Sequence, residues 1–200
     1  MDSNSSGERY LPDTVQESVK ILVVGGFGVG KSTLIGSVSE IAPLRTEEAL
    51  TQAGADVDDL RGVDDKSTTT VALDFGRLTL SEHVVLYLFG APGQRRFWDQ
   101  WVSLATGAIG VVLLVDPRRI TDAFDVLDQL EEKVDAPLLV AANQFDDAPV
   151  YSGSEIRQSL TLPDDVPVIG CDARNRSSCL TVLASLIQHA HSAHSPKALR

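Results

Sequence analysis

Residues 19–32 read VKILVVGGFGVGKS, an apolar run followed by a glycine-rich turn that ends in a lysine and a serine. The run 19–24 has the length and composition of a buried strand, and residues 31–40 have helical character. Residues 25–32 match the pattern G-x-x-x-x-G-K-[ST], in which backbone N–H groups converge on phosphate oxygens. Because strand, turn and helix follow one another in this order, the sequence predicts a P-loop.

Further apolar runs alternate with helical patterns along the rest of the chain. Five runs are predicted to be strands, at residues 70–79, 84–89, 108–116, 137–143 and 166–170. Helices are predicted at residues 121–133, 154–160 and 177–188, where apolar side chains recur with helical spacing. Strands that are apolar on both faces indicate a sheet covered on both sides. We therefore expect an α/β fold of P-loop NTPase type, with a mainly parallel six-stranded sheet and about five helices on both faces.

The length of 200 residues, 43% of them hydrophobic, suits one domain with one core. We expect the folded domain at residues 18–190, with flexible tails at 1–17 and 191–200, because both ends lack a hydrophobic period. Residues 41–69 also lack a firm period and are predicted to form a long insertion.

Charge and composition exclude several classes of partner. The chain has 28 acidic and 17 basic residues, a formal charge of −11, which argues against binding to nucleic acid or to anionic lipid. The longest apolar stretch, residues 108–115, is far shorter than the roughly 20 residues of a membrane helix. Asp2 follows Met1 and no prenylation box ends the chain, so no direct membrane anchor is expected. Together with only two cysteines, these features predict a cytoplasmic protein, which partners could recruit to a membrane.

The predicted P-loop supplies the first candidate site residues. Lys31 is expected to reach the outer phosphates and to act in catalysis, and the Ser32 hydroxyl to bind Mg²⁺. The expected phosphate-binding residues are Gly25, Gly28, Val29, Gly30, Lys31, Ser32 and Thr33. The alternative interpretation is a glycine-rich turn with a surface lysine.

A second candidate site follows the apolar run 138–142, where residues 143–146 read NQFD. The carboxylate of Asp146 can accept two hydrogen bonds from guanine, one from N1–H and one from the 2-amino group. Adenine lacks this pair of donors. Asp146 is therefore predicted to read the base, with Asn143 and Gln144 in the same loop. The alternative is a turn of Asn-x-x-Asp composition without a ligand.

With these two motifs the sequence resembles the Ras-like small GTPases over nearly all of its folded part. TVALDF at 70–75 is similar to the end of switch I, which implies that Thr70 binds Mg²⁺; a β-branched strand start is the alternative. GAPGQ at 90–94 resembles the switch II motif D-x-x-G-Q. This implies that Gly93 contacts nucleotide and that Gln94 orients the attacking water. CDAR at 171–174 resembles the loop that packs on the base, which adds Asp172, Ala173 and Arg174.

Three positions depart from the Ras-like pattern. Gly90 replaces the aspartate that holds Mg²⁺ through water, Gln144 replaces a lysine, and Phe27 replaces a small glycine that faces the γ-phosphate. Loss of that carboxylate is expected to weaken Mg²⁺ binding. Asp64 or Asp65, in an acidic stretch within residues 56–65, could replace it, or the stretch is simply a solvated loop.

A switch II without the aspartate and a long switch I resemble the bacterial MglA-type GTPases. Residues 43–48, 68–76 and 93–98 are similar to the actinobacterial conservon GTPases, a resemblance that implies roadblock-type and sensor-kinase-like partner proteins. It also implies a switch that binds GTP or GDP with Mg²⁺, hydrolyses GTP slowly and signals through these partners. The alternatives are a non-hydrolysing nucleotide-binding adaptor and, with less support, a P-loop ATPase or small-molecule kinase.

Overall fold

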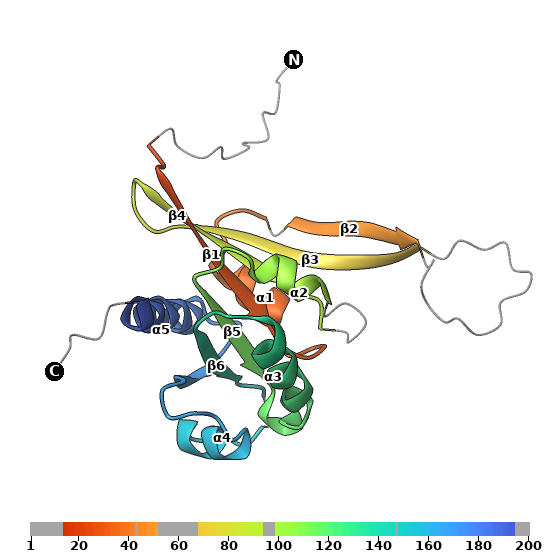
Figure 1. Ribbon diagram of the computed structural model, residues 1–200, viewed down its shortest axis with the longest axis vertical. Coiled ribbons are helices and arrows are strands. Elements are labelled where there is room, and N and C mark those ends of the chain that lie inside the picture. The colour runs from red at the N-terminus through yellow and green to blue at the C-terminus, as the bar shows by residue number, and fades with distance from the viewer. Residues whose placement is uncertain (1–13, 43, 52–67, 94–98, 147, 195–200) are drawn as a thin grey trace, which may run out of the picture.

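The computed structural model describes residues 14–42, 44–51, 68–93, 99–146 and 148–194. Its centre is one seven-stranded sheet with the strand order β2-β3-β4-β1-β5-β6-β7 (Figure 1). The strands are β1 (Glu17–Val24), β2 (Leu44–Thr51), β3 (Thr68–Thr79), β4 (Val84–Gly90), β5 (Gly110–Val115), β6 (Leu138–Asn143) and β7 (Val168–Cys171). The glycine-rich turn therefore leaves the sheet from its central strand, β1.

Most of the sheet is parallel, as the sequence predicts. β1 pairs in parallel with β4 and β5, and the parallel pairing continues through β6 to β7. β3 pairs antiparallel with both β4 and β2. β2 is one strand more than the six expected, and it lies within residues 41–69. Its alternation of polar and apolar residues is weak, so only its pairing with β3 at the sheet edge defines it as a strand.

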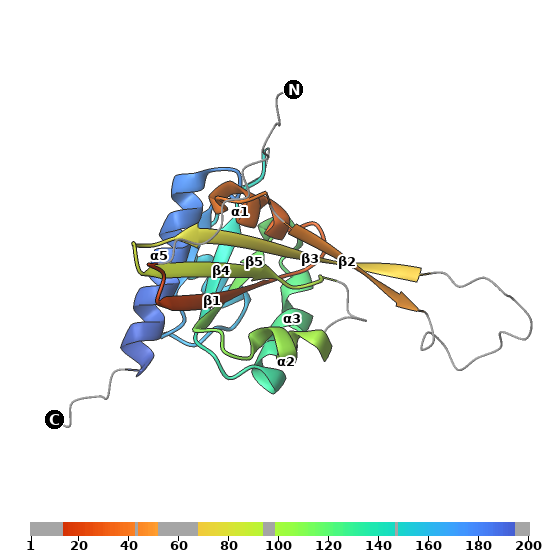
Figure 2. The ribbon, with the colours of Figure 1, turned by 90° about the horizontal axis from the view of Figure 1, so that it is seen from above.

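Five α-helices are described beside this sheet: α1 (Lys31–Val38), α2 (Asp99–Ala105), α3 (Asp122–Lys133), α4 (Gly153–Ser159) and α5 (Arg176–His194). α1 and α5 lie on one face of the sheet, and α2 and α3 lie on the other (Figure 2). The helices predicted at 121–133, 154–160 and 177–188 are confirmed as α3, α4 and α5. α5 continues to His194, four residues beyond the predicted end of the domain at 190.

The core forms two layers because the central strands are buried on both faces. In β5, Val112 and Leu114 belong to the layer beneath α1 and α5, whereas Val111, Leu113 and Val115 belong to the layer of α2, α3 and α4. This alternation follows from the period of two in a strand. Both layers reach the ends of β1, β5 and β6, so they hold the loops at these ends in place.

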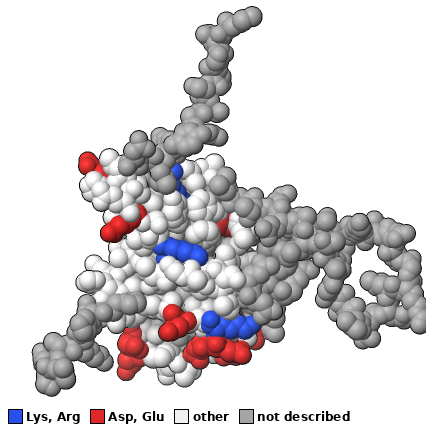
Figure 3. All heavy atoms as spheres, turned by 45° about the horizontal axis from the view of Figure 1, so that its top comes forward, with Lys and Arg blue, Asp and Glu red and all other residues white. Residues whose placement is uncertain are grey.

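One face of the surface shows how the charges are arranged (Figure 3). Asp and Glu side chains gather at the lower edge of this face, whereas the Lys and Arg side chains lie apart from one another. Within the described residues, no helix combines the length and the apolar character that crossing a membrane requires.

The contact between β5 and α5 gives a test of the packing. Leu186 is fully buried, and a Cβ added at Gly110 would lie 2.8 Å from its Cδ1 atom. Leu186→Ala is expected to lower the free energy of unfolding by about 2–5 kcal/mol, and Gly110→Ala by about 1–3 kcal/mol through overpacking. In the double variant the new methyl group occupies space that Leu186 has vacated, so denaturant unfolding should show a loss smaller than the sum. Strictly additive losses would contradict this packing.

Candidate functional site

The turn between β1 and α1 has a backbone that only glycine adopts easily. Gly25, Gly28 and Gly30 have φ values of 145°, 77° and 104°. Space is also short: a Cβ at Gly25 would lie 2.3 Å from the Leu114 carbonyl oxygen, and one at Gly30 would lie 2.7 Å from the Asn143 amide nitrogen. The glycines of the motif are therefore required both by conformation and by the close approach of β5 and β6.

The ammonium group of Lys31 lies inside this turn. Its Nζ atom donates hydrogen bonds to the carbonyl oxygens of Gly25 and Gly26, each at 2.9 Å. Burial lowers the pKa of Lys31 to about 8, and the nearby carboxylate of Asp74 opposes this shift. A buried cation among backbone groups is well placed to pair with an incoming anion.

A hollow of about 390 Å³ lies in front of the turn and α1. Its lining residues are Phe27, Gly28, Gly30, Lys31, Ser32, Thr33, Asp74, Ala91, Pro92 and Gly93. Gly93 closes one side: a Cβ there would lie 2.8 Å from Gly26 and from Lys31 Nζ. Two predicted phosphate-binding residues, Gly25 and Val29, are not among the lining residues of this hollow. Gly25 packs against Leu114 of β5, and the Val29 side chain is buried in the core.

Two predicted switch residues are only partly covered by the structure. Gln94 lies outside the described residues, although its neighbour Gly93 lies against the P-loop. Thr70 is in β3, where its backbone pairs with Ala49 of β2; its side chain is outside the description. Their roles in water orientation and Mg²⁺ binding stay predictions. Asp64 and Asp65 also lie outside the described residues.

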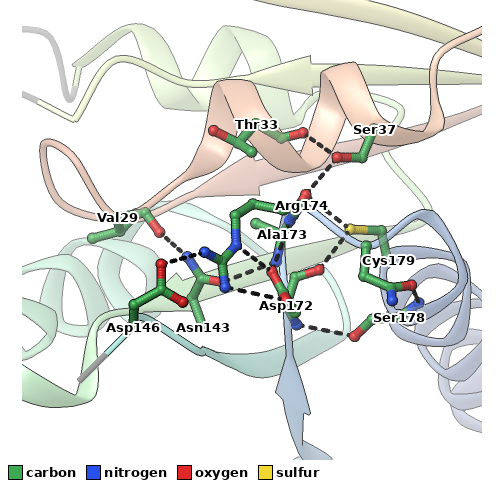
Figure 4. A network of polar contacts seen from close by, with 11 residues as sticks. Val29, Thr33, Ser37, Asn143, Asp146, Asp172, Ala173, Arg174, Ser178 and Cys179 are labelled. Atoms are coloured by element: carbon green, nitrogen blue, oxygen red, sulfur yellow. Dashed lines mark hydrogen bonds and ion pairs between the residues drawn. The ribbon is translucent and has the colours of Figure 1, made fainter. Parts of the chain in front are cut away.

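The amide side chain of Asn143 joins the P-loop to the loop after β7 (Figure 4). Its Nδ2 atom donates to the Val29 carbonyl at 2.9 Å, and its Oδ1 atom accepts from the Ala173 backbone N–H at 3.0 Å. Asn143 is 4% exposed, so both bonds are shielded from water. Ser37 of α1 adds a third connection by donating to the Ala173 carbonyl at 2.5 Å. Residues 143 and 173 thus hold two separate loops at a defined distance.

The predicted base-reading residues surround a second hollow of about 190 Å³. Its lining residues are Gly28, Gly30, Thr33, Asn143, Gln144, Phe145, Asp146, Ala173 and Arg174. Gly28, Gly30 and Thr33 also line the first hollow, so the two adjoin along the P-loop. Gln144 is exposed, and its backbone N–H donates to Cys171.

Arg174 lies between two carboxylates at the open end of the second hollow. Its Nη1 atom is 2.8 Å from Asp146 Oδ2, and its Nε atom is 2.9 Å from Asp172 Oδ1. These partners raise the pKa of Arg174, with the Asp172 hydrogen bond as the largest cause. Asp172 holds Arg174 and is outside the lining of both hollows described above. Exposed ion pairs of this kind contribute little to stability because water screens them.

Two residues that the sequence did not single out also contact the P-loop region. Arg119, just after β5, donates from Nη2 to the Phe27 carbonyl at 3.1 Å. The buried carboxylate of Asp116 lies 3.4 Å from Arg119 Nε and receives Arg118 at 2.8 Å, and the hydrogen bonds from Arg118 keep the pKa of Asp116 below its usual value. Only the run of charged residues directly after a buried strand could have indicated this anchor.

The second such residue is Asp74 in β3, which accepts a hydrogen bond from Ser32 Oγ at 2.5 Å. Mg²⁺ prefers oxygen ligands and keeps several of its waters. A serine hydroxyl at the start of α1 and a carboxylate beside it form a donor set that fits this ion. Ser32 would hold it together with phosphate oxygens, and the ion would neutralise phosphate charge.

The comparison with known families places the chain in one of them. A family model described as conserved hypothetical ATP binding protein matches residues 23–193. The chain belongs to this family. Its fold is that of a G domain: the G domain of the FeoB iron transporter of T. maritima superimposes with a TM-score of 0.54 at 18% identity, over 88% of this chain and 98% of that one. Among curated proteins, none matches this sequence.

The lowered pKa of Lys31 predicts that phosphate binding takes up a proton. Because the free ammonium titrates at about pH 8 and a bound phosphate raises its pKa, binding at pH 8 should take up about half a proton. Uptake should fall towards zero at pH 7, where Lys31 is already charged. Calorimetry of GDP binding in buffers of different ionisation enthalpy measures this quantity.

Lys20 is the matched control, because burial also lowers its pKa while its ammonium group bonds to Thr106, away from the P-loop. Lys20→Met should leave the proton uptake unchanged. Equal uptake at pH 7 and pH 8 in the wild type would show that Lys31 is not the titrating group.

Proposed function

We propose that the protein is a guanine-nucleotide switch that binds GTP or GDP with Mg²⁺ and hydrolyses GTP slowly. The observation that carries this proposal is that two hollows share lining residues of the P-loop, and that Asp146 lines the second of them. A nucleotide placed along them has its phosphates against residues 28–33 and its base against residues 143–146 and 173–174. The bridge through Asn143 joins these two halves of the site.

The base preference follows from the chemistry of the carboxylate. The Asp146 side chain is 81% exposed, and Arg174 is its only partner among the described contacts. Guanine presents two donors to such an acceptor, whereas adenine presents an acceptor at N1. The Asp146–Arg174 ion pair is exposed to water and therefore weak. A guanine that replaces Arg174 as the partner of Asp146, or binds Asp146 beside it, would thus lose little binding free energy.

Exchanging the carboxylate of Asp146 for an amide should change the base that is bound. Asp146→Asn is expected to lower GDP affinity by about tenfold or more, since one charge-assisted hydrogen bond is worth about 1.5–3 kcal/mol. The same variant should gain affinity for xanthosine diphosphate, whose 2-oxo group accepts from the new amide while its N1–H still donates. Fluorescence titrations with guanine, xanthine and adenine diphosphates measure both changes.

The control is Asp128→Asn, which removes an exposed carboxylate of α3 and should leave all three affinities unchanged. Loss of guanine binding without a gain for xanthine would contradict the role of Asp146. Tight binding of the adenine probe by the wild type would favour the second candidate, an ATP-binding protein, which the description of the family as ATP binding supports.

Hydrolysis would use Lys31, Mg²⁺ and Gln94. Lys31 would neutralise charge that moves to the bridging oxygen, Ser32 would hold the Mg²⁺ that supplies further positive charge, and Gln94 would orient the attacking water. Two features support slow turnover: an exposed phenyl ring at Phe27 in the first hollow, and an Arg119 side chain that donates to the Phe27 carbonyl.

We expect an intrinsic GTP turnover on the order of 10⁻³ s⁻¹ or slower, without a partner protein. Gln94→Leu should lower this rate at least tenfold while leaving GTP affinity within about twofold, because the side chain acts on water. Single-turnover phosphate release measures the rate. A rate near the roughly 10 s⁻¹ of a typical metabolic enzyme would contradict the proposal.

Binding without any hydrolysis would instead favour the non-hydrolysing adaptor. The resemblance to the conservon GTPases supports roadblock-type and sensor-kinase-like proteins as the proposed partners, with the segments around residues 70 and 94 as their contacts.

A further inference from the structure

The end of β4 carries a glycine, and the strand beside it carries a buried carboxylate. Gly90 and Asp74 are directly paired in the antiparallel ladder between β4 and β3. Asp74 is 8% exposed, lines the hollow in front of the P-loop, and accepts a hydrogen bond from Ser32 Oγ. Burying a carboxylate at this depth is unfavourable unless a cation or hydrogen bonds stabilise it. The Ser32 hydroxyl and the nearby ammonium group of Lys31 provide such stabilisation, so Asp74 is part of the P-loop site.

The glycine makes room for this carboxylate. A Cβ added at Gly90 would lie 3.0 Å from Asp74 Cβ and 3.3 Å from Asp74 Oδ2, and 2.9 Å from Ile35 Cδ1. Both distances to Asp74 are tighter than ordinary van der Waals contact, so a side chain at position 90 would require Asp74 and Ile35 to shift. The backbone of Gly90 is not in the left-handed region, which leaves space as the reason for the glycine.

We propose that Asp74 is the carboxylate of the Mg²⁺ site, supplied from β3 because β4 provides none. Its hydrogen bond orients the Ser32 hydroxyl, which would leave the lone pairs of that oxygen available to the ion. Asp74 is thus a positioning residue that acts through Ser32. This inference rests on the proposed function, because the ion arrives together with nucleotide phosphates.

The position of Asp74 also bears on the acidic stretch within residues 56–65. Asp64 or Asp65 is not needed as a substitute carboxylate, since Asp74 already bonds to the predicted ligand Ser32. An Asp64→Asn/Asp65→Asn variant should accordingly keep the Mg²⁺ dependence of the wild type.

The test measures how free Mg²⁺ slows the release of a fluorescent N-methylanthraniloyl-GDP, with the corresponding ADP probe in parallel. Asp74→Asn should need about 10–100 times more free Mg²⁺ than the wild type to reach half of the maximal slowing of probe release. In EDTA the variant should release the probe at the wild-type rate or more slowly, because a negative charge near the phosphates has been removed. Asp128→Asn is the control for loss of an exposed carboxylate.

Two further variants separate positioning from a merely structural role. If Asp74 acts through Ser32, the double variant Ser32→Ala/Asp74→Asn should shift the Mg²⁺ midpoint no further than Ser32→Ala alone. Asp74→Gly/Gly90→Asp, which moves the carboxylate to the neighbouring strand, should recover most of the Mg²⁺ dependence that Asp74→Gly loses. Circular dichroism establishes that each variant is folded.

The possible outcomes are distinct. An Mg²⁺ midpoint of Asp74→Asn within twofold of the wild type would overturn the proposal, as would an equal change of release in EDTA and in Mg²⁺. Mg²⁺-independent release from the wild type would overturn it while nucleotide binding stands. If the wild type binds only the ADP probe, the proposed preference for guanine is wrong. The role of Asp74 is then tested by the Mg²⁺ dependence of ADP-probe release. Binding of neither probe would remove both proposals.

Discussion

The two hydrogen bonds of the Asn143 amide hold the candidate site together. One end of the side chain binds the P-loop at Val29 and the other binds the loop after β7 at Ala173, and both bonds are buried. These loops leave the sheet from strands that are not neighbours, β1 and β7, with β5 and β6 between them. A buried amide with partners on both sides is costly to separate, because each loop would keep an unsatisfied polar group. The distance between the P-loop and the base-side hollow depends on it.

The sheet also decides which side chains can share a site. Carboxyl ends of parallel strands meet at one edge, which brings the loops after β1, β5, β6 and β7 together. β3 runs antiparallel to β4, so Asp74, which pairs with Gly90 at the end of β4, arrives at the same edge. Asp74 therefore reaches Ser32 although 42 positions separate them in the chain.

Much of the fold could be predicted from local patterns. The apolar runs are strong signals because strands buried on two faces are apolar throughout. The amphipathic spacing of residues 121–133 and 177–188 is strong because burial on one face of a helix leaves a clear period. β2 could not be predicted, since an edge strand is defined by hydrogen bonds to its neighbour and its own residues show little alternation. For the site, the P-loop and Asp146 belong to contiguous motifs. Asp74 and Arg119 contact the P-loop through tertiary packing, and no fixed spacing marks them.

By itself the sequence determined that the chain has a P-loop between a strand and a helix, because the glycines at 25, 28 and 30 and the residues Lys31 and Ser32 act through local geometry. It also determined that an acidic residue, Asp146, closely follows the strand predicted at 137–143, because these residues are neighbours in the chain. Only the tertiary structure decided that the P-loop and the base-side loops form adjoining hollows, and that the carboxylate next to Ser32 comes from β3. Strand pairing and register bring such groups together, and these depend on contacts between residues far apart in the chain.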